Sequence, residues 1–566
     1  MKDYLTKYNQ WLAKVTDDKL LAELKAMTDS DKEEAFSGEL SFGTAGLRGV
    51  MTAGTARMNI YTVYRATEGL ARYMDAHGLK CCAITYDSRN NSRLFSEITA
   101  ATLASHGIKV YITRECMPTP FLSYMVRELG CDTGVNVTAS HNPAEYNGYK
   151  VYDRQGCQLL DDDANEVTSY IESVQLFQQP LPEFSDYENK LIEYTGEKLE
   201  NNYIERVLQE RLSTEPIDSL KVVYSPLNGA GYRIVPEVLR RVGLRNLEIV
   251  SEQATPNGDF PTCPYPNPEL PKTLTLAKDL AAASGADIVI ANDPDCDRLG
   301  VAVKNGAEFQ QLSGNEVGVL LTDYILSRLY GDVKSTTATC ATAKRNIPAN
   351  PVLVKTIVTT IMVDAIAKDF GAEVKDVLTG FKYIGNVIAN LEAKGQKERY
   401  LFGFEESCGY LKGSYVRDKD GVIAALLIAE CAAYHKNSGI SLLQRLNQLY
   451  EKYGYFFQNT VSYRFEGLEG ERIKNQLLGS LRKSPIAKLG NSKVVDTCDF
   501  LTQTQMDLPK ADVLRYRSSD GSQLIVRPSG TEPLIKCYIT VKGNEKDLKK
   551  RYEAIRKQIE EIFNEK

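Results

Sequence analysis

The sequence predicts an α/β fold that ends in a smaller α+β unit. Short β-branched strands, polar or glycine-rich loops and amphipathic helices recur in that order along most of the chain. Strands that alternate with helices favour parallel sheets. The tail instead has several strands, the turn "SSDGS" and a long charged helix. A chain of 566 residues has room for about four domains.

The first 35 residues are charged and helical in period. We expect one helix with Leu5, Tyr8 and Leu12 on its apolar face and a second with Leu20 and Leu24 on its own. Strands that run into loops then follow: "KCCAITYDSR", "IKVYITRECMPTP", "DTGVNVTASHNP", "SLKVVYSPLNGAGYRIVPEVLRRVG", "DIVIANDPDCDR" and "ERYLFGFEESCGY". In α/β sheets ligands bind beyond the carboxyl ends of strands, so these loops should carry the chemistry.

Three polar junctions divide the chain, near residues 180–205, 325–337 and 434–443. They predict domains at 1–205, 206–325, 326–440 and 441–566.

Composition excludes several classes of protein. The apolar share of 43% and charged share of 25% are those of a soluble globular chain. A net charge of −6 argues against a nucleic-acid partner. Twelve cysteines without a C-x-x-C motif indicate reduced thiols and a cytoplasmic location. There is no signal-peptide h-region, and the longest apolar run is too short to span a membrane and is interrupted by Glu430.

The segment "NDPDCDRLG" is the candidate metal site. It follows the apolar strand "ADIVIA" and carries Asp293, Asp295 and Asp297. In an extended loop these alternate carboxylates would converge on one side and repel one another unless a cation neutralised them. Hard oxygen ligands suit Mg²⁺. An EF-hand is excluded by Arg298 and Lys304 at its glycine and glutamate positions, which leaves a solvated acidic turn as the alternative.

The segment "RPSGTEPLIKCY" suits a phosphate. Ser529, Gly530 and Thr531 offer backbone N–H groups and hydroxyls in a tight turn, with Arg527 beside them. The alternative is a plain turn between strands.

Other segments could contact a substrate. "GTAGLRG" lacks the P-loop signature, and Arg48 either reaches a phosphate or lies in a linker. "GFEESCGYLKG" could bind sugar hydroxyls through carboxylates and a hydroxyl, or merely cap a helix. The candidates in this group are Arg48, Thr379, Gly380, Lys382, Glu405, Ser407 and Lys419.

The segment "TASHNPAEYNGYK" places Ser140 beside His141, as if in a hydrolase. The nucleophile elbow G-x-S-x-G is absent, and adjacent side chains rarely face each other. Ser140 fits better as a phosphoryl carrier, with the metal and Arg298 offsetting charge on the transferring group. Lys150 and His141 are candidates for proton transfer. The alternative is a serine that only shapes a turn.

Together, "GTAGLRG", "TASHNPAEYNGYK", "DPDCDR", "GFEESCGY" and "RPSGTEP" resemble the α-D-phosphohexomutase family, in the branch of bacterial phosphoglucomutases and phosphopentomutases. The resemblance implies three similar mixed α/β sandwich domains and a smaller C-terminal α+β domain around a central cleft. Cys296 departs from the small Ala or Gly usual in the metal loop, but it is small enough for that loop to survive.

The resemblance also implies roles for these residues. Ser140 would be the phosphoserine, and its phosphate would join Asp293, Asp295 and Asp297 around one Mg²⁺. Lys150 would be a general acid/base, with His141 as a second candidate. Glu405 and Ser407 would bind the sugar. The phosphate that is not transferred would meet the loop of Arg527, Ser529, Gly530 and Thr531.

The implied activity is interconversion of glucose 1-phosphate and glucose 6-phosphate through glucose 1,6-bisphosphate. The alternatives are a phosphopentomutase, a sugar-bisphosphate synthase or phosphatase, and a non-catalytic sugar-phosphate-binding protein. The expected partners are small sugar phosphates, and the expected state is a monomer with a dimer as alternative.

Overall fold

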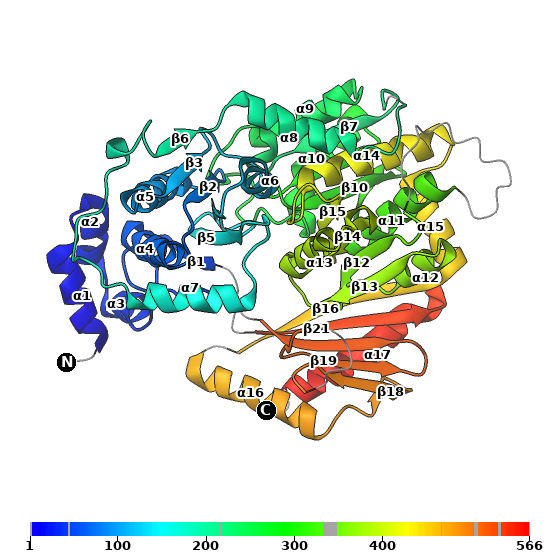
Figure 1. Cartoon of the computed structure of the whole chain (residues 1–566). Helices are drawn as coiled ribbons and strands as arrows, with labels where there is room; N and C mark the ends of the chain where they lie inside the picture. Colours follow the sequence, from blue (N-terminus) through cyan, green and yellow to red (C-terminus); the bar gives the residue numbers. More distant parts are fainter. Residues whose placement is uncertain are drawn as a thin grey trace.

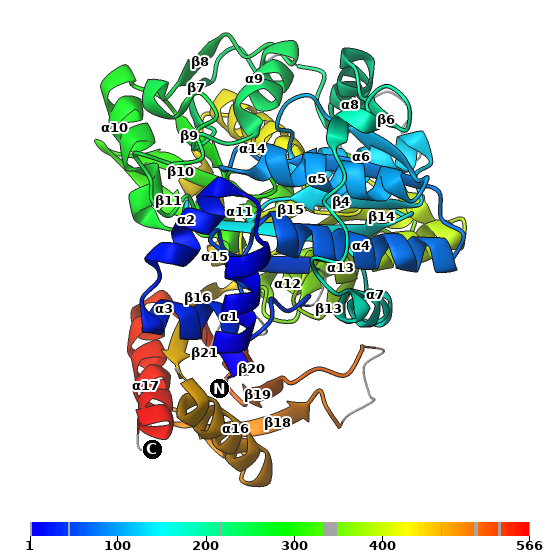
Figure 2. The same cartoon turned by 90° about the vertical axis from the view of Figure 1, so that its left-hand side faces the viewer.

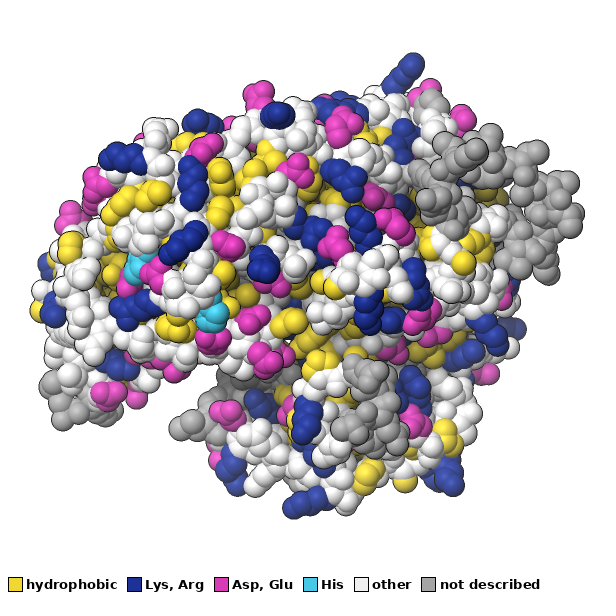
Figure 3. Space-filling view, in the orientation of Figure 1, with side chains coloured by type: hydrophobic (Ala, Val, Ile, Leu, Met, Phe, Trp, Pro, Cys, Tyr) yellow, Lys and Arg dark blue, Asp and Glu magenta, His cyan; other side chains and the backbone are white. Residues whose placement is uncertain are grey.

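Four β-sheets follow one another along the chain, and the last lies beneath the other three in Figure 1. The computed structural model describes residues 3–43, 46–215, 217–331, 348–465, 467–502, 508–529 and 534–564. Figure 3 shows acidic and basic side chains interspersed over one face, with an indentation between the upper body and the C-terminal sheet.

Three helices, rather than the two expected, precede the first sheet: α1 (Asp3–Lys14), α2 (Asp18–Ala26) and α3 (Asp29–Phe36). The third was missed because its apolar face is narrow, although Thr28 begins it with a capping box. Trp11 is buried in this helical cluster and meets Phe36 and Tyr61 edge to face.

The first sheet has the strand order β1-β5-β4-β2-β3-β6. Strands β2, β3, β4 and β6 run parallel, whereas β5 is antiparallel to both β4 and β1. The bounds of the strands are β1 Gly46–Val50, β2 Cys81–Tyr86, β3 Lys109–Ile112, β4 Thr133–Val137, β5 Tyr146–Asp153 and β6 Ile192–Tyr194. The helices of this unit are α4 Ile60–Ala76, α5 Ser92–Ser105, α6 Thr119–Leu129 and α7 Asp161–Ser173.

The second and third sheets have the orders β11-β10-β9-β7-β8 and β13-β12-β14-β15. Their strands are β7 Lys221–Ser225, β8 Asn246–Ile249, β9 Ile288–Asn292, β10 Leu299–Asn305, β11 Glu308–Leu312, β12 Val352–Thr356, β13 Glu373–Val377, β14 Tyr400–Glu405 and β15 Gly409–Lys412. Their helices are α8 Glu197–Gln209, α9 Gly231–Arg241, α10 Thr275–Ser284, α11 Gly314–Tyr330, α12 Met362–Asp369, α13 Phe381–Ala393, α14 Gly421–Asn437 and α15 Leu442–Tyr453. Short 3₁₀ helices are η1 Phe184–Asp186, η2 Ser251–Gln253, η3 Pro271–Leu274 and η4 Lys397–Arg399.

The same connection, a short loop between two antiparallel neighbouring strands, recurs in these three sheets. A short loop after β4, β9 or β14 returns the chain as an antiparallel neighbour, β5, β10 or β15. A parallel return would need a crossover of about a dozen residues, which these loops do not have. The sheets are therefore mixed rather than simply parallel, and each of these loops carries one of the segments singled out above.

The fourth sheet is antiparallel throughout, in the order β16-β21-β20-β19-β18-β17. Its elements are β16 Tyr455–Arg464, α16 Gly467–Lys483, β17 Lys488–Leu489, β18 Ser492–Asp499, β19 Leu514–Ser518, β20 Gln523–Pro528, β21 Leu534–Gly543 and α17 Glu545–Asn564. Helices α16 and α17 share a core with one face of the sheet (Figure 2). The other face packs through Ile525 and Tyr538 on Ile357 and Val358. These last two residues belong to the third unit, which is the third sheet with its helices.

Two of the three expected junctions fall inside helices rather than between elements. Position 205 lies inside α8, whose Tyr203 and Val207 are buried, and position 325 lies inside α11. Position 440 lies between α14 and α15, which pack against each other. The domain division by residue number stays a proposal. Within the described ranges, no helix combines the length and apolar character that a membrane crossing requires.

Candidate active site

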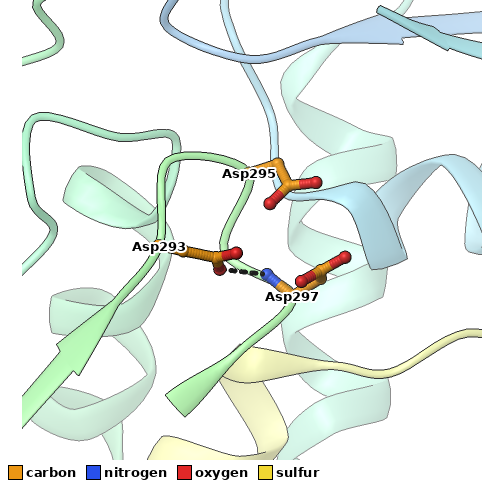
Figure 4. Close-up of side chains that lie close together, drawn as sticks. All are labelled: Asp293, Asp295 and Asp297. Carbon is orange, nitrogen blue, oxygen red and sulfur yellow. Dashed lines mark hydrogen bonds between the residues drawn. The ribbon is translucent and has the colours of Figure 1, made fainter. Parts of the chain in front are cut away.

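The turn between β9 and β10 gathers three buried carboxylates. One carboxylate oxygen each from Asp293, Asp295 and Asp297 lies within 4.8 Å of the others (Figure 4). The turn is tight, not extended as expected: the Cys296 N–H donates to the Asp293 carbonyl (2.8 Å), and Cys296 has φ 52°. Asp293 Oδ1 also accepts the N–H groups of Asp297 (3.1 Å) and Arg298 (2.9 Å). The side chains converge because of this turn, and not because alternate residues face one way.

Two lysines face this carboxylate cluster. Lys150 Nζ lies 3.1 Å from Asp295 Oδ2, and Lys419 Nζ lies 2.9 Å from Asp297 Oδ2. Burial and repulsion from the other two carboxylates raise the pKa of Asp293 well above its ordinary value. Burial also opposes ionisation of Asp295, but Lys150 and Lys419 outweigh it and lower the pKa of that carboxyl.

The cluster has the chemistry of a divalent-cation site. Asp295 Oδ1 and Asp297 Oδ1 are buried and accept no hydrogen bond from a described residue. Leaving buried carboxylate oxygens unsatisfied is costly, so oxygen donors of this kind fit a hard cation such as Mg²⁺.

Ser140 lies directly against this cluster. Its Oγ donates to Asp293 Oδ2 at 3.0 Å, across 153 positions of sequence. Its φ of 52° also turns its side chain toward His141, so that Oγ and Nδ1 are 3.2 Å apart. The expectation that these adjacent side chains do not face each other was therefore wrong. Desolvation and the nearby Arg298 and Arg48 lower the pKa of His141 well below its usual value, so its ring is neutral.

A residue that the sequence did not single out, Arg89, holds the Ser140 loop. Its guanidinium is fully buried, and it donates to the carbonyl oxygens of Ser140 (2.6 Å), Pro143 (2.7 Å) and Tyr146 (3.1 Å). Asp87 lies 3.2 Å from Arg89 Nε and accepts from the Thr138 hydroxyl at 2.6 Å. The only sequence signal was the position of "YDSR" at the end of a buried strand.

Backbone hydrogen bonds join the loop after β14 to the turn between β9 and β10 that carries the three aspartates, called the metal turn below. The Leu299 N–H donates to the Cys408 carbonyl at 2.9 Å, and the Gly421 N–H to the Cys296 carbonyl at 3.2 Å. Glu405, at the end of β14, accepts the Gly380 N–H at 3.0 Å. The segments expected to bind metal and sugar thus lie together.

The remaining third-unit candidates surround this junction. Lys382 Nζ is 2.6 Å from Asp161 Oδ1 at the start of α7, which links the first and third units. The buried Thr379 hydroxyl oxygen has no hydrogen-bond partner among the described residues. Ser407 is half-buried between β14 and β15. Burial raises the pKa of Glu405 and, together with repulsion from Glu405, raises the pKa of Glu406 to about 7.

Two candidates lie at the edges. Arg48 is exposed on β1, and its Nη1 donates to Asn142 Oδ1 of the Ser140 loop at 3.1 Å. Arg527 is the second-last residue of β20, and the Ser529 N–H donates to the Leu534 carbonyl at 2.8 Å. Gly530 and Thr531 lie outside the described residues. Burial raises the pKa of Tyr538 on β21, and the nearby charge of Glu406 raises it further while that of Arg527 lowers it. This edge of the sheet therefore faces the loop after β14, which carries Glu406.

Four family domains match the chain in order. They are described as phosphoglucomutase/phosphomannomutase α/β/α domains I, II and III, at residues 39–177, 201–306 and 313–453, and C-terminal domain, at 481–558. A phosphoglucomutase of Staphylococcus epidermidis is 34% identical over 552 residues, covering 94% of this chain and 96% of the relative. One of Staphylococcus saprophyticus is 33% identical over 563 residues, covering 96% and 98%.

Solved structures share the fold. A phosphoglucomutase/phosphomannomutase family protein of Burkholderia thailandensis has a TM-score of 0.68 at 19% identity, covering 93% of this chain and 98% of its own. The open form of parafusin, a phosphoglucomutase of Paramecium, also reaches 0.68, at 17% identity, covering 93% and 95%. The predicted fold class is confirmed. By its four matching domains and its full-length relatives, the chain belongs to the α-D-phosphohexomutase family.

Proposed function

We propose that the chain is a phosphoglucomutase, which interconverts glucose 1-phosphate and glucose 6-phosphate through a phosphoserine and glucose 1,6-bisphosphate. The observation that carries the proposal is the 3.0 Å contact between Ser140 Oγ and Asp293 in a buried carboxylate triad. The full-length bacterial relatives named phosphoglucomutases support the choice of substrate.

The triad and a phosphate on Ser140 would hold a Mg²⁺ ion. A phosphoserine brings about −1.5 to −2 charges at neutral pH, next to carboxylates that already repel one another. When bound, the ion neutralises this charge and withdraws electrons from the phosphoryl oxygens.

The residues of the chain divide the remaining work. The bond from phosphorus to Ser140 Oγ breaks as a bond forms to a hydroxyl oxygen of the sugar monophosphate, and that hydroxyl loses its proton. Lys150, held at the triad by Asp295, is the proposed proton carrier at the sugar hydroxyl, with neutral His141 as the second candidate beside Oγ. The bisphosphate then turns over, and its other phosphate returns to Ser140.

Substrate binding falls to the neighbouring loops. Glu405 and Ser407 would hold sugar hydroxyls, with Thr379, Gly380, Lys382 and Lys419 around them. Arg48 and the loop of Arg527, Ser529, Gly530 and Thr531 would meet phosphate. Holding the reactants in line can supply on the order of 7–11 kcal/mol of the barrier in the best intramolecular cases.

A coupled assay that forms glucose 6-phosphate from glucose 1-phosphate, with Mg²⁺ and the bisphosphate, tests the proposal. Ser140→Ala should abolish turnover and leave the thermal unfolding midpoint nearly unchanged. Intact mass before and after phosphatase treatment should show one phosphoryl group on the wild type and none on the variant. Full mutase activity of Ser140→Ala would refute the phosphoserine. A higher kcat/KM for ribose 1-phosphate than for glucose 1-phosphate would make the enzyme a phosphopentomutase instead.

The setting of the activity is part of the same proposal. All eleven described cysteines are free thiols, which supports a cytoplasmic enzyme. We propose a monomer, which sedimentation would distinguish from a dimer.

A further inference from the structure

Glu269 lies outside every segment discussed so far, yet it contacts the site. Its Oε1 pairs with Arg298 Nη1, which belongs to the metal turn. Glu269 precedes η3 on a stiff loop: its N–H donates to Asn267 Oδ1 (3.0 Å), and Pro268 lies just before it. A Cβ on Gly300 would come within 2.7 Å of Pro268, so this loop lies tightly on β10. The backbone that carries Glu269 is therefore held against β10.

The guanidinium of Arg298 has one nitrogen that is paired and one that makes no hydrogen bond to a described residue. Its Nη1 is bound by Glu269, while its Nε is buried and makes no hydrogen bond to any described residue. Nε lies 3.9 Å from Asp293 Oδ2, the oxygen that accepts from Ser140 Oγ. The free donor thus faces the place where a phosphoryl group on Ser140 would develop charge, where a preorganised donor is most effective.

Without Glu269, the nearest ion-pair partner of Arg298 among the described residues is Asp293. A guanidinium released from Glu269 would close the 3.9 Å gap and form a charge-assisted bond with that carboxylate. It would then compete with a cation for a ligand oxygen, and its Nε would no longer face the phosphoryl group.

We propose that Glu269 is a positioning residue for phosphoryl transfer, which holds Arg298 away from Asp293 so that its Nε stays directed at the phosphate on Ser140. The proposal rests on the proposed function for its catalytic consequence. Its structural claim, that Glu269 keeps Arg298 off the metal ligands, can be tested without turnover.

The kinetic test compares Glu269→Gln, Arg298→Gln and the double variant. We expect Glu269→Gln to lower kcat about 10- to 100-fold, as for other residues that orient a ligand, with KM for glucose 1-phosphate nearly unchanged. In the Arg298→Gln background the same change should alter kcat by less than about twofold, because coupled residues are not additive. Glu252→Gln is the matched control: Glu252 lies on the same stretch between β8 and η3, is exposed, and its carboxylate accepts from the Ser251 hydroxyl, so the kcat of this variant should equal that of the wild type.

The second test titrates the dephosphorylated full chain with Mn²⁺ in a calorimeter. Glu269→Gln should weaken Mn²⁺ binding about tenfold, and Arg298→Gln should cancel that loss. Because Glu269 is 36% exposed, its substitution should leave the fold intact, and Glu269→Asp, which keeps the charge, should retain more Mn²⁺ affinity than Glu269→Gln.

The outcomes separate the two claims. Equal losses from Glu269→Gln with and without Arg298, in both kcat and Mn²⁺ affinity, would overturn the positioning role. Unchanged Mn²⁺ affinity in Glu269→Gln would overturn it as well. A wild type without mutase activity would count against the proposed function, while the Mn²⁺ titration would still decide the role of Glu269.

Discussion

Arg89→Met should loosen the loop that carries Ser140 without touching the catalytic groups. The variant keeps a long apolar stem but loses the guanidinium that donates to the carbonyl oxygens of Ser140, Pro143 and Tyr146. Arginine side chains are rarely buried this completely, and this one is 0% exposed together with its partner Asp87.

The cost can be bounded from these contacts. Hydrogen bonds to a charged group contribute about 1.5–3 kcal/mol each, and removing one partner of a buried ion pair costs about 3–5 kcal/mol. These values are not additive, because the same guanidinium makes all the contacts. We therefore take about 3–5 kcal/mol for local opening of the loop. Since every 1.4 kcal/mol is tenfold, the open population should be larger by about 10²- to 4 × 10³-fold.

Hydrogen exchange followed by mass spectrometry measures this directly. Protected amides of the loop include Ser140, which donates to Thr138 Oγ1 at 2.8 Å, and Asn142, which donates to the Ala139 carbonyl at 3.1 Å. Peptides spanning 138–146 should exchange about 100-fold faster or more in Arg89→Met. Arg93→Met is the control, because Arg93 is 65% exposed and its ion pair with Glu97 lies at the surface. Wild-type exchange of 138–146 in Arg89→Met would refute the clamp.

Glu406→Gln tests the effect of burial on the loop after β14. The pKa of Glu406 is raised to about 7, so its protonated form stabilises the fold at low pH and this stability is lost as pH rises from about 4.5 to 7. The variant should melt higher than the wild type at pH 8 and at nearly the same temperature at pH 5; equal melting at both would contradict the assignment. Asp297→Asn should weaken Mg²⁺ or Mn²⁺ binding at least tenfold by calorimetry, because Asp297 Oδ1 has no other described hydrogen-bond partner, and unchanged affinity would place the cation elsewhere. Gly148→Ala should cost about 1–3 kcal/mol by thermal unfolding, since its Cβ would lie 2.4 Å from the Thr138 carbonyl oxygen. Gly196→Ala is its control, because nothing lies within 4 Å of the added Cβ. Similar melting temperatures of the two variants would show that β5 can shift to accept the added Cβ without loss of stability.

Local patterns were enough to find the loops of the site. The apolar strand before Asp293 and the strand before Thr138 end where their polar residues begin, and each such end proved to be the turn between β9 and β10 or between β4 and β5. This works because a buried strand and the loop after it are written in consecutive residues. The order of the strands, and hence that these turns meet, depends on packing between distant segments.

The conformations within the loops could not be predicted in the same way. Ser140 and Cys296 both adopt a left-handed φ near 52°, which their residue types do not favour. That conformation brings His141 to Ser140 and draws the three aspartates together.

Long-range partners left even less trace in the sequence. Arg89 binds carbonyl oxygens 51 to 57 positions away, and backbone carbonyls carry no signature. Glu269 reaches Arg298 from 29 positions away, and the loop that carries it contains none of the motifs that the sequence analysis singled out. Lys419 was singled out only as a possible substrate contact, whereas its amine lies at the triad, next to Asp297.

The backbone bonds from Leu299 to Cys408 and from Gly421 to Cys296 bear on how such an enzyme can be rebuilt from parts. These bonds join the second and third units directly beside the carboxylate triad. Replacing either unit alone with its counterpart from a relative would place a new interface at the candidate active site. The C-terminal sheet has no such bonds to the metal turn among the described residues; it meets the third unit mainly through side chains such as Ile525 and Tyr538. A chimaera with residues 455–564 taken from a relative should therefore keep the proposed phosphoserine and the cation affinity of the carboxylate triad, while its preference among sugar phosphates changes. The C-terminal domain can therefore be exchanged without disturbing the carboxylate triad, which lies in the second unit and is bonded to the third.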